Sequence, residues 1–193
     1  MAQLSGNKKI KTAVFISGTG SNLKNLIQFS KKKKSPISID LIISNNLNSK
    51  GLKFAKIYKI EKKIIKFKKR TLDEKKLLKI LKNRGTNLIC LAGFMKILSQ
   101  KFIKNFKGKI LNIHPSLLPK YKGLDTHKRV LVNKEKYTGC TVHFVSSKLD
   151  AGKIVVQKRI KIKKNDTPKK IARRVLIEEH KLYPKAILKI FNP

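Results

Sequence analysis

The sequence has few of the features that stabilise secreted proteins or span membranes. It contains two cysteines, Cys90 and Cys140, which lie in separate apolar runs and form no CxxC pair. Two isolated cysteines do not make a disulfide framework, so we expect buried, reduced thiols. No apolar run approaches the about 20 residues that cross a bilayer. The basic start and the short apolar run 13–16 do not resemble a secretory signal. We therefore expect a cytoplasmic protein with no membrane partner.

Acidic residues are also scarce. There are 10 Asp and Glu against 48 Lys and Arg, which gives a formal net charge of +38. Such a charge suits nucleic-acid binding, but the lysines are spread along the whole chain and accompany many isoleucines and asparagines. Because A/T-rich codons encode all three residues, compositional drift explains the pattern better. We expect no specific nucleic-acid partner, although the positive field would attract small anions.

The length and the pattern of apolar residues indicate one α/β domain. A chain of 193 residues that is 40% apolar can bury its own core. Strand-like and helix-like segments alternate, which predicts an open, mostly parallel twisted sheet with helices on both faces. The expected strands are residues 11–17, 38–44, 64–67, 87–92, 109–113, 138–145 and 153–162. The expected helices are residues 22–32, 50–58, 72–83 and 167–191. We expect the last helix to be kinked at Pro184. We expect a single domain, 1–193, with a Rossmann-like, nucleotide-binding half (1–108) and a catalytic half (109–193).

A glycine-rich turn joins the first expected strand to the first expected helix, in the sequence ISGTGSNL of residues 16–23. Glycines let the backbone approach a ligand, and the N–H groups at a helix start attract an anion such as a phosphate. Leu23 replaces the third glycine of the dinucleotide fingerprint, and no acidic residue follows the second strand, which argues against NAD. Two interpretations remain open: a phosphate site, or a plain turn capped by Ser21.

The segment LNIHPSLLP, residues 111–119, contains the clearest candidates for catalysis. Asn112 and His114 are two apart on a strand, so their side chains lie on one face, at a strand end where ligands of α/β sheets bind. An amide N–H can stabilise an oxyanion, and an imidazole can exchange a proton near neutral pH. Asp150, in a turn before a glycine, is the best carboxylate to orient His114 and raise its pKa. Each of the three could instead be a structural residue.

The other histidines are interpreted as structural. His143 alternates with core residues of its strand, while His127 and His180 are interpreted as structural helix residues. The histidines, cysteine and aspartate between positions 114 and 150 do not have the spacing of a standard metal site, so we expect no metal.

These segments resemble the folate-dependent glycinamide ribonucleotide formyltransferases over residues 12–184. The resemblance rests on motifs in the same order: ISGTGSNL at 16–23, LAGFMKIL at 91–98, LNIHPSLLPKY at 111–121, GCTVHFV at 139–145, LDAG at 149–152 and EHKLYP at 179–184. It implies transfer of the formyl group of 10-formyltetrahydrofolate to the amine of 5-phosphoribosylglycinamide in de novo purine biosynthesis. The products would be the N-formyl compound and tetrahydrofolate.

The resemblance also implies roles for the matching residues. Asn112, His114 and Asp150 correspond to the catalytic set, in which Asp150 would keep His114 protonated. The phosphoribosylglycinamide site corresponds to Gly20, Ser21, Asn22, Leu23, Lys24 and Glu179. The 10-formyltetrahydrofolate site corresponds to Arg70, Met95, Lys96, Ile97, Leu98, Asn112, Ser146, Ser147, Lys148, Leu149 and Asp150. Several relatives have histidine where this chain has Asp125, so no role is assigned there.

Three other functions are considered. A methionyl-tRNA formyltransferase shares the HPSLLP-type loop, but the chain is shorter than expected for an enzyme with an added RNA-binding domain. A formyltetrahydrofolate hydrolase would carry a regulatory domain in front. A polyanion-binding protein without activity is suggested by charge alone. We expect small-molecule substrates and a monomer or homodimer.

Overall fold

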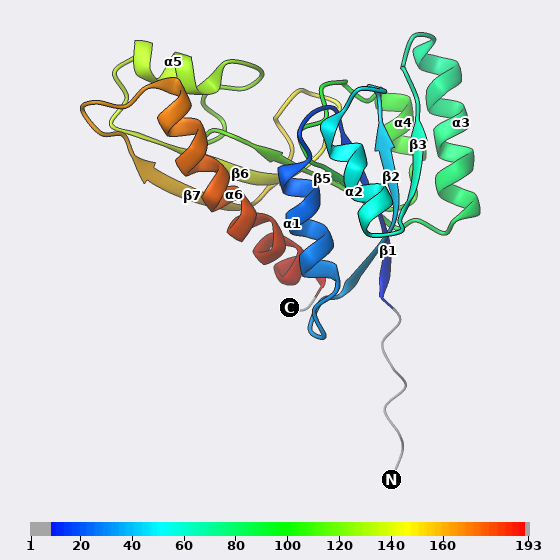
Figure 1. Cartoon of the computed structure of the whole chain (residues 1–193). Helices are drawn as coiled ribbons and strands as arrows, with labels where there is room; N and C mark the ends of the chain where they lie inside the picture. Colours follow the sequence, from blue (N-terminus) through cyan, green and yellow to red (C-terminus); the bar gives the residue numbers. More distant parts are fainter. Residues whose placement is uncertain (1–8, 192–193) are drawn as a thin grey trace.

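The structure is a computed structural model, which describes residues 9–191. These residues form a seven-stranded sheet flanked by helices (Figure 1). In chain order the elements are β1 (Ile10–Ile16), α1 (Ser21–Ser30), β2 (Ile37–Ser44), the 3₁₀ helix η1 (Lys50–Leu52), α2 (Lys53–Ile57), β3 (Glu61–Ile64), α3 (Arg70–Asn83), β4 (Leu88–Leu91), α4 (Gln100–Asn105), β5 (Lys109–His114), α5 (Thr126–Val132), β6 (Tyr137–Phe144), β7 (Ile154–Lys161) and α6 (Pro168–Phe191).

The strands lie in the order β3-β2-β1-β4-β5-β6-β7. The first five are parallel, and β6 and β7 are antiparallel to their neighbours. The chain leaves β1 toward β2 and β3 and then returns to β4 on the other side of β1. At such a reversal the loops after the two central strands separate and leave a crevice for a ligand. The turn after β1 and the loop after β4 therefore flank the same crevice.

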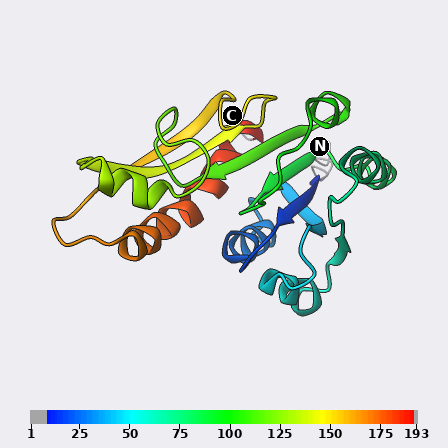
Figure 2. The same ribbon diagram turned by 90° about the horizontal axis from the view of Figure 1, so that it is seen from above.

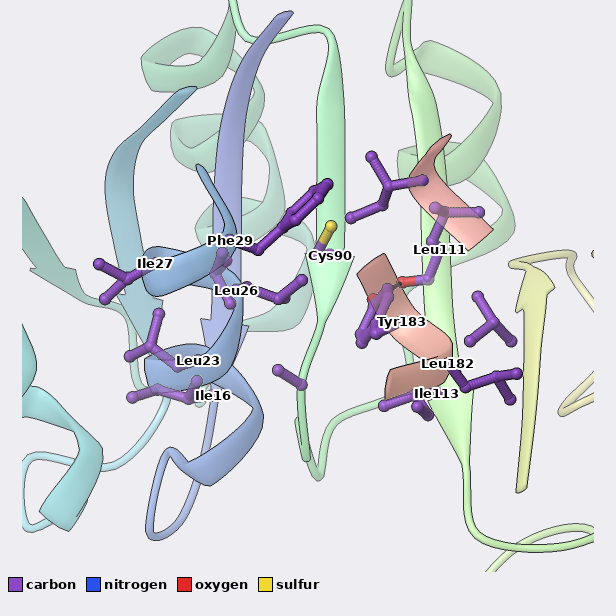
Figure 3. Close-up of a cluster of buried hydrophobic side chains, with 14 of the residues drawn as sticks. Ile16, Leu23, Leu26, Ile27, Phe29, Cys90, Leu111, Ile113, Leu182 and Tyr183 are labelled. Atoms are coloured by element: carbon purple, nitrogen blue, oxygen red, sulfur yellow. Dashed lines mark hydrogen bonds between the residues drawn. The ribbon is translucent and has the colours of Figure 1, made fainter. Parts of the chain in front are cut away.

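Helices cover both faces of the sheet, as predicted (Figures 1 and 2). On one face α1 and α6 bury Leu23, Leu26 and Tyr183 against the strands, and Figure 3 shows these side chains around Cys90 of β4. On the other face α3 and α4 contribute a second apolar cluster that includes Leu77 and Phe102. Burial of both faces explains why the central strands consist almost entirely of apolar residues.

Two details of the sequence-based fold were wrong or missing. The third strand was predicted at 64–67, but β3 is Glu61–Ile64. It is an edge strand with exposed charged residues, which carry no apolar periodicity, and Phe67 has a φ of 55° that ends the extended backbone. The short helices α4 and α5 were not among the predicted ranges, because six and seven residues give little helical periodicity. Helix α6 continues through Pro184.

Both thiols are buried, as predicted. Burial raises the pKa of Cys90 and of Cys140 to about 12, so neither is a reactive thiolate at neutral pH. Among residues 9–191 no helix is both long enough and apolar enough to cross a membrane.

Candidate active site

A cavity of about 980 Å³ lies at the carboxyl ends of β4 and β5. Its walls come from the start of α1, the loops after β4, β5 and β6, and the first half of α6. The volume suits a ligand of drug or cofactor size. Asn112, His114, Asp150 and Glu179 all line it, so residues far apart in the sequence meet in one space.

Asp150 is the centre of a polar cluster at the base of this cavity. Its Oδ2 accepts a hydrogen bond from the Gly123 N–H at 2.9 Å and lies 3.4 Å from His114 Nδ1. Its Oδ1 accepts from Asn112 Nδ2 at 3.4 Å and lies 3.6 Å from His143 Nε2. The structure thus brings the three predicted catalytic residues together.

The turn that carries Asp150 depends on the glycine that follows it. A Cβ atom on Gly152 would lie 1.7 Å from the carbonyl oxygen of Phe144, so no other residue fits without moving the strand end. Asp150 itself has a φ of 46°, a left-handed conformation that short polar residues tolerate. Together these features bend the β6–β7 connection back over β5.

His114 is held between two acceptors. Its Nε2 lies 2.8 Å from the Tyr121 carbonyl oxygen, and its Nδ1 faces the Asp150 carboxylate. Burial lowers the pKa of His114 more than the Tyr121 carbonyl and the Asp150 charge raise it. Asp150 raises the pKa of His114, as predicted, but desolvation outweighs the carboxylate, so the expectation that His114 stays protonated is wrong.

Asp150 remains ionised in the same environment. Burial raises its pKa, but the adjacent His143 ring, the hydrogen bond from the Gly123 amide and the electrostatic influence of His114 lower it overall. The unliganded site therefore combines a neutral imidazole with a carboxylate at neutral pH.

His143 belongs to the site, although the sequence suggested only a structural role. It lies opposite Asn112 in the β5–β6 ladder and is 2% exposed. Its Nδ1 donates to the Phe144 carbonyl at 2.8 Å, and in the neutral ring Nε2 is then the acceptor. Nε2 then accepts from Asn112 Nδ2 at 3.2 Å and orients that amide. The contact between His143 and Asn112 follows from the pairing of β5 with β6, which the sequence alone does not give.

The glycine turn places the start of α1 at the cavity. Gly20 is the N-cap, with a φ of 75°, and a Cβ there would lie 2.6 Å from Gly51 Cα. Ser21 is the first helical residue and not the cap, and within residues 9–191 no side chain caps this helix, so the alternative of a turn capped by Ser21 is not found. Ser21 and Asn22 line the cavity, whereas Gly20, Leu23 and Lys24 do not. Leu23 is fully buried in the core, and Lys24 is exposed.

Glu179 connects α6 to α1 inside the cavity. Its Oε2 accepts a hydrogen bond from Asn22 Nδ2 at 2.7 Å, and the residue is 8% exposed. Burial raises the pKa of Glu179, and the single hydrogen bond from Asn22 offsets this only in part. A buried carboxylate with one donor is suited to bind a ligand group that donates hydrogen bonds.

The residues predicted to bind the folate line the same cavity, with one exception. Apolar side chains are unusually exposed here: Met95 is 64%, Ile97 59% and Leu149 50% exposed. Such a cluster suits a flat apolar ligand. The lining residues from the predicted set are Met95, Lys96, Ile97, Leu98, Asn112, Ser146, Ser147, Lys148, Leu149 and Asp150. Arg70 is not among them, since it begins α3 and its Nε lies 3.5 Å from Glu74 Oε1.

Two further polar residues line the cavity near α5. Asp125 is the N-cap of α5 with a φ of 55°, and His127 lies in its first turn. Burial, and secondarily the charge of His114, lower the pKa of His127. Among residues 9–191 no group of three or more His, Cys, Asp and Glu side chains has a metal-binding arrangement.

Comparison with known proteins identifies the family. The profile of the formyl transferase family matches residues 10–187. The chain belongs to this family. A phosphoribosylglycinamide formyltransferase from Haemophilus influenzae is 39% identical over 92% of this chain and 85% of its own length. The crystal structure of a phosphoribosylglycinamide formyltransferase from Brucella melitensis is 39% identical, with a TM-score of 0.89 over 95% of this chain and 96% of that one.

Other formyl transferase relatives are much longer. The trifunctional purine biosynthetic protein adenosine-3 of Gallus gallus is 45% identical over 93% of this chain, which spans only 18% of that protein. The present sequence therefore corresponds to one part of the trifunctional protein, and to most of the bacterial enzymes.

The histidines of this chain make its stability depend on pH. Burial lowers the pKa of His114, His127 and His180 below the usual 6.5, so the folded state binds fewer protons than the unfolded state. Their contribution is complete above about pH 6.5 and is lost as the pH falls through the folded-state values. The raised pKa of Glu179 acts in the opposite direction, but three histidines outweigh one carboxyl group, so we expect a lower melting temperature at about pH 5.0 than at about pH 7.5. An unchanged or higher value at the acidic pH would contradict the assignment of these histidines as neutral.

Proposed function

We propose that the chain transfers the formyl group of 10-formyltetrahydrofolate to the amine of 5-phosphoribosylglycinamide in purine biosynthesis. The observation that carries the proposal is the convergence of Asn112, His114 and Asp150 in one cavity, next to the uncapped start of α1. The substrates are small molecules; a cytoplasmic location, a monomer or homodimer, and the absence of a nucleic-acid partner are part of the proposal.

The ribonucleotide occupies the part of the cavity between α1 and α6. The first-turn N–H groups of α1 have no partner within the helix, and with the helix dipole they bind the phosphate. Glu179 accepts hydrogen bonds from the glycinamide end of the molecule. Leu23 and Lys24 contribute through their position on α1, because neither side chain lines the cavity. This arrangement directs the free amine toward Asn112.

The folate occupies the part lined by the loop 95–98 and the loop 146–150. The exposed apolar side chains of Met95, Ile97 and Leu149 cover its ring system. Lys96 and Lys148 lie at the same part of the cavity and suit its carboxylates. The formyl group then lies near Asn112 and His114. Holding both substrates in one geometry removes much of the entropic barrier to a reaction between two molecules.

The amine attacks the formyl carbon, a C–N bond forms and negative charge develops on the formyl oxygen. Asn112 donates an N–H to this oxygen. Its present contacts, at 3.2 Å to His143 and 3.4 Å to Asp150, are long for hydrogen bonds and are readily exchanged. The bond to N10 of the folate then breaks, and N10 receives the proton that the amine loses.

His114 changes its charge during this reaction. It is neutral in the unliganded chain because burial outweighs its two acceptors. An oxyanion beside the ring adds a third favourable interaction with the cation, so the pKa of His114 rises as charge develops. His114 can therefore take up the proton of the amine and release it to N10, while Asp150 stabilises the imidazolium.

The direct test is an assay of the purified chain with 10-formyltetrahydrofolate and each candidate acceptor. We expect formylation of 5-phosphoribosylglycinamide and no transfer to initiator tRNA or to water. Transfer to tRNA would favour a methionyl-tRNA formyltransferase. Release of formate without an acceptor would favour a hydrolase, and salt-sensitive RNA binding without turnover would favour a polyanion-binding protein.

Replacing Glu179 with glutamine should separate stability from function. Burial raises the pKa of Glu179, so its ionisation at neutral pH costs folding free energy that a neutral amide avoids. We expect the melting temperature of Glu179→Gln at neutral pH to rise by roughly 2–4 °C. The KM for the ribonucleotide should rise about tenfold, because a charged hydrogen bond to the substrate is lost.

Glu178→Gln provides the control, since Glu178 is the neighbouring residue of α6 and pairs with Lys181 at the surface. Glu178→Gln should change neither the melting temperature nor the KM for the ribonucleotide appreciably. A Glu179→Gln variant that is less stable than the parent, with an unchanged KM, would contradict the role of Glu179.

A further inference from the structure

Ser17 connects two of the loops that are proposed to bind the substrates. Ser17 follows β1 and begins the glycine turn, while Gly93 and Met95 belong to the loop after β4. The Ser17 N–H donates to the Gly93 carbonyl at 3.1 Å, and the Met95 N–H donates to Ser17 Oγ at 2.7 Å. The hydroxyl of Ser17 donates in turn to Asn45 Oδ1, after β2. One side chain therefore connects the ends of three parallel strands.

The hydrogen bonds of Ser17 have a fixed direction. A hydroxyl has one proton, and here Asn45 accepts it, so the lone pairs of Oγ are available to the Met95 N–H. The rest of the loop after β4 has an apolar anchor, because Phe94 packs edge-on against Phe15 at 5.3 Å and Phe67 at 5.5 Å. Met95 itself is 64% exposed, so its side chain packs little, while its backbone N–H is bound by Ser17.

The glycine turn has separate anchors. Ser49 Oγ donates to the Gly18 carbonyl at 2.7 Å, and the Gly51 N–H donates to the same oxygen at 3.0 Å. Removal of the Ser17 side chain would leave both of these contacts in place. It would leave the Met95 N–H without its partner.

We propose that Ser17 is a positioning residue. It fixes the position of the folate-binding loop after β4 relative to the phosphate-binding turn after β1. The inference rests on the proposed function, which places the folate against Met95, Ile97 and Leu98 and the phosphate at the start of α1. Ser17 does not line the cavity and acts through Met95. The formyl carbon and the amine must approach within bonding distance, so the spacing of the two loops affects the rate as well as binding.

Ser17→Ala tests this role by its separate effects on the two KM values and on kcat. We expect the KM for 10-formyltetrahydrofolate to rise roughly tenfold, because the ligand must now order a loop that has lost a hydrogen bond. The kcat should fall severalfold, and the KM for the ribonucleotide should change less than about twofold. Ser17→Thr retains the hydroxyl and should restore most of the folate KM.

Ser49→Ala is the matched control, since it removes a serine hydroxyl that contacts the glycine turn alone. It should raise the KM for the ribonucleotide and leave that for the folate unchanged. Equal changes of both KM values in Ser17→Ala, or no change in either, would overturn the positioning role.

Amide hydrogen exchange of Met95, followed by NMR in the unliganded chain, provides a readout independent of turnover. Faster exchange at Met95 in Ser17→Ala than in Ser17→Thr supports the inference, and identical exchange overturns it. If the parent chain transfers no formyl group, the proposed function fails, but the exchange measurement still decides whether Ser17 holds the loop.

Discussion

Replacing Asp150 with asparagine should lower kcat by about 10²–10⁴-fold, because the proton transfer loses its carboxylate. Asp150 touches every other polar group of the cluster: His114, His143, Asn112 and the Gly123 amide. Asparagine keeps the size of the side chain and can still accept from the Gly123 amide. It removes the charge that favours imidazolium at His114, so that state becomes harder to form.

The measurement is steady-state kinetics with both substrates, together with a melting curve for the variant. Asp73→Asn is the control: Asp73 also accepts a hydrogen bond from a backbone amide, that of Lys69, but does not line the cavity. It should retain full activity. A folded Asp150→Asn variant with near-normal kcat would show that the carboxylate takes no part in the reaction.

Asn112→Ala and His114→Ala should each lower kcat by about 10²–10³-fold, since each removes a group that stabilises the developing oxyanion. Both groups act on the same charge, so we expect the double variant to lose much less than the product of the two single losses. His180→Ala is the control, because His180 lies next to Glu179 on α6 but outside the lining of the cavity.

Two results other than the expected partial overlap of the two losses would be informative. Independent effects, in which the two losses multiply, would mean that Asn112 and His114 act on different steps or atoms. Full activity of both single variants would remove the proposed mechanism altogether.

The fold was largely predictable because local patterns and burial agree in the central strands. β1, β2 and β4 are apolar runs of strand length, and turns with polar or glycine residues separate them from amphipathic helices. The agreement failed at the sheet edge, where no strand of the described residues 9–191 pairs with the outer side of β3. An edge strand does not need the apolar alternation that identifies a strand in a sequence.

The candidate site was predictable only in its side-chain identities. The positions of Asn112 and His114 on one strand required them to share a face, and Asp150 was selected because it lies in a turn before a glycine in a chain with few acidic residues. The contribution of His143 depends on the register between β5 and β6, which no local pattern specifies. The Tyr121 carbonyl and the Gly123 amide are backbone groups, so the sequence could not reveal them.

The pKa of His114 shows why a residue list does not determine a mechanism. The neighbouring carboxylate suggested a raised pKa, and the structure gives the opposite direction because the ring is buried. The consequence is chemical: a neutral imidazole can accept the proton of the attacking amine, whereas a permanent imidazolium could not. The proposed proton transfer depends on this difference.

The central claim is that one cavity holds the phosphate at the start of α1 and the amine beside Asn112, His114 and Asp150. A crystal structure with 5-phosphoribosylglycinamide and a folate analogue that cannot transfer its one-carbon group tests it most directly. We predict phosphate oxygens within hydrogen-bond distance of the Ser21 and Asn22 amides, and the amine between Asn112 and the folate. A ribonucleotide bound elsewhere, for example in the basic pocket of Lys163, Lys170 and Arg173, would contradict the account.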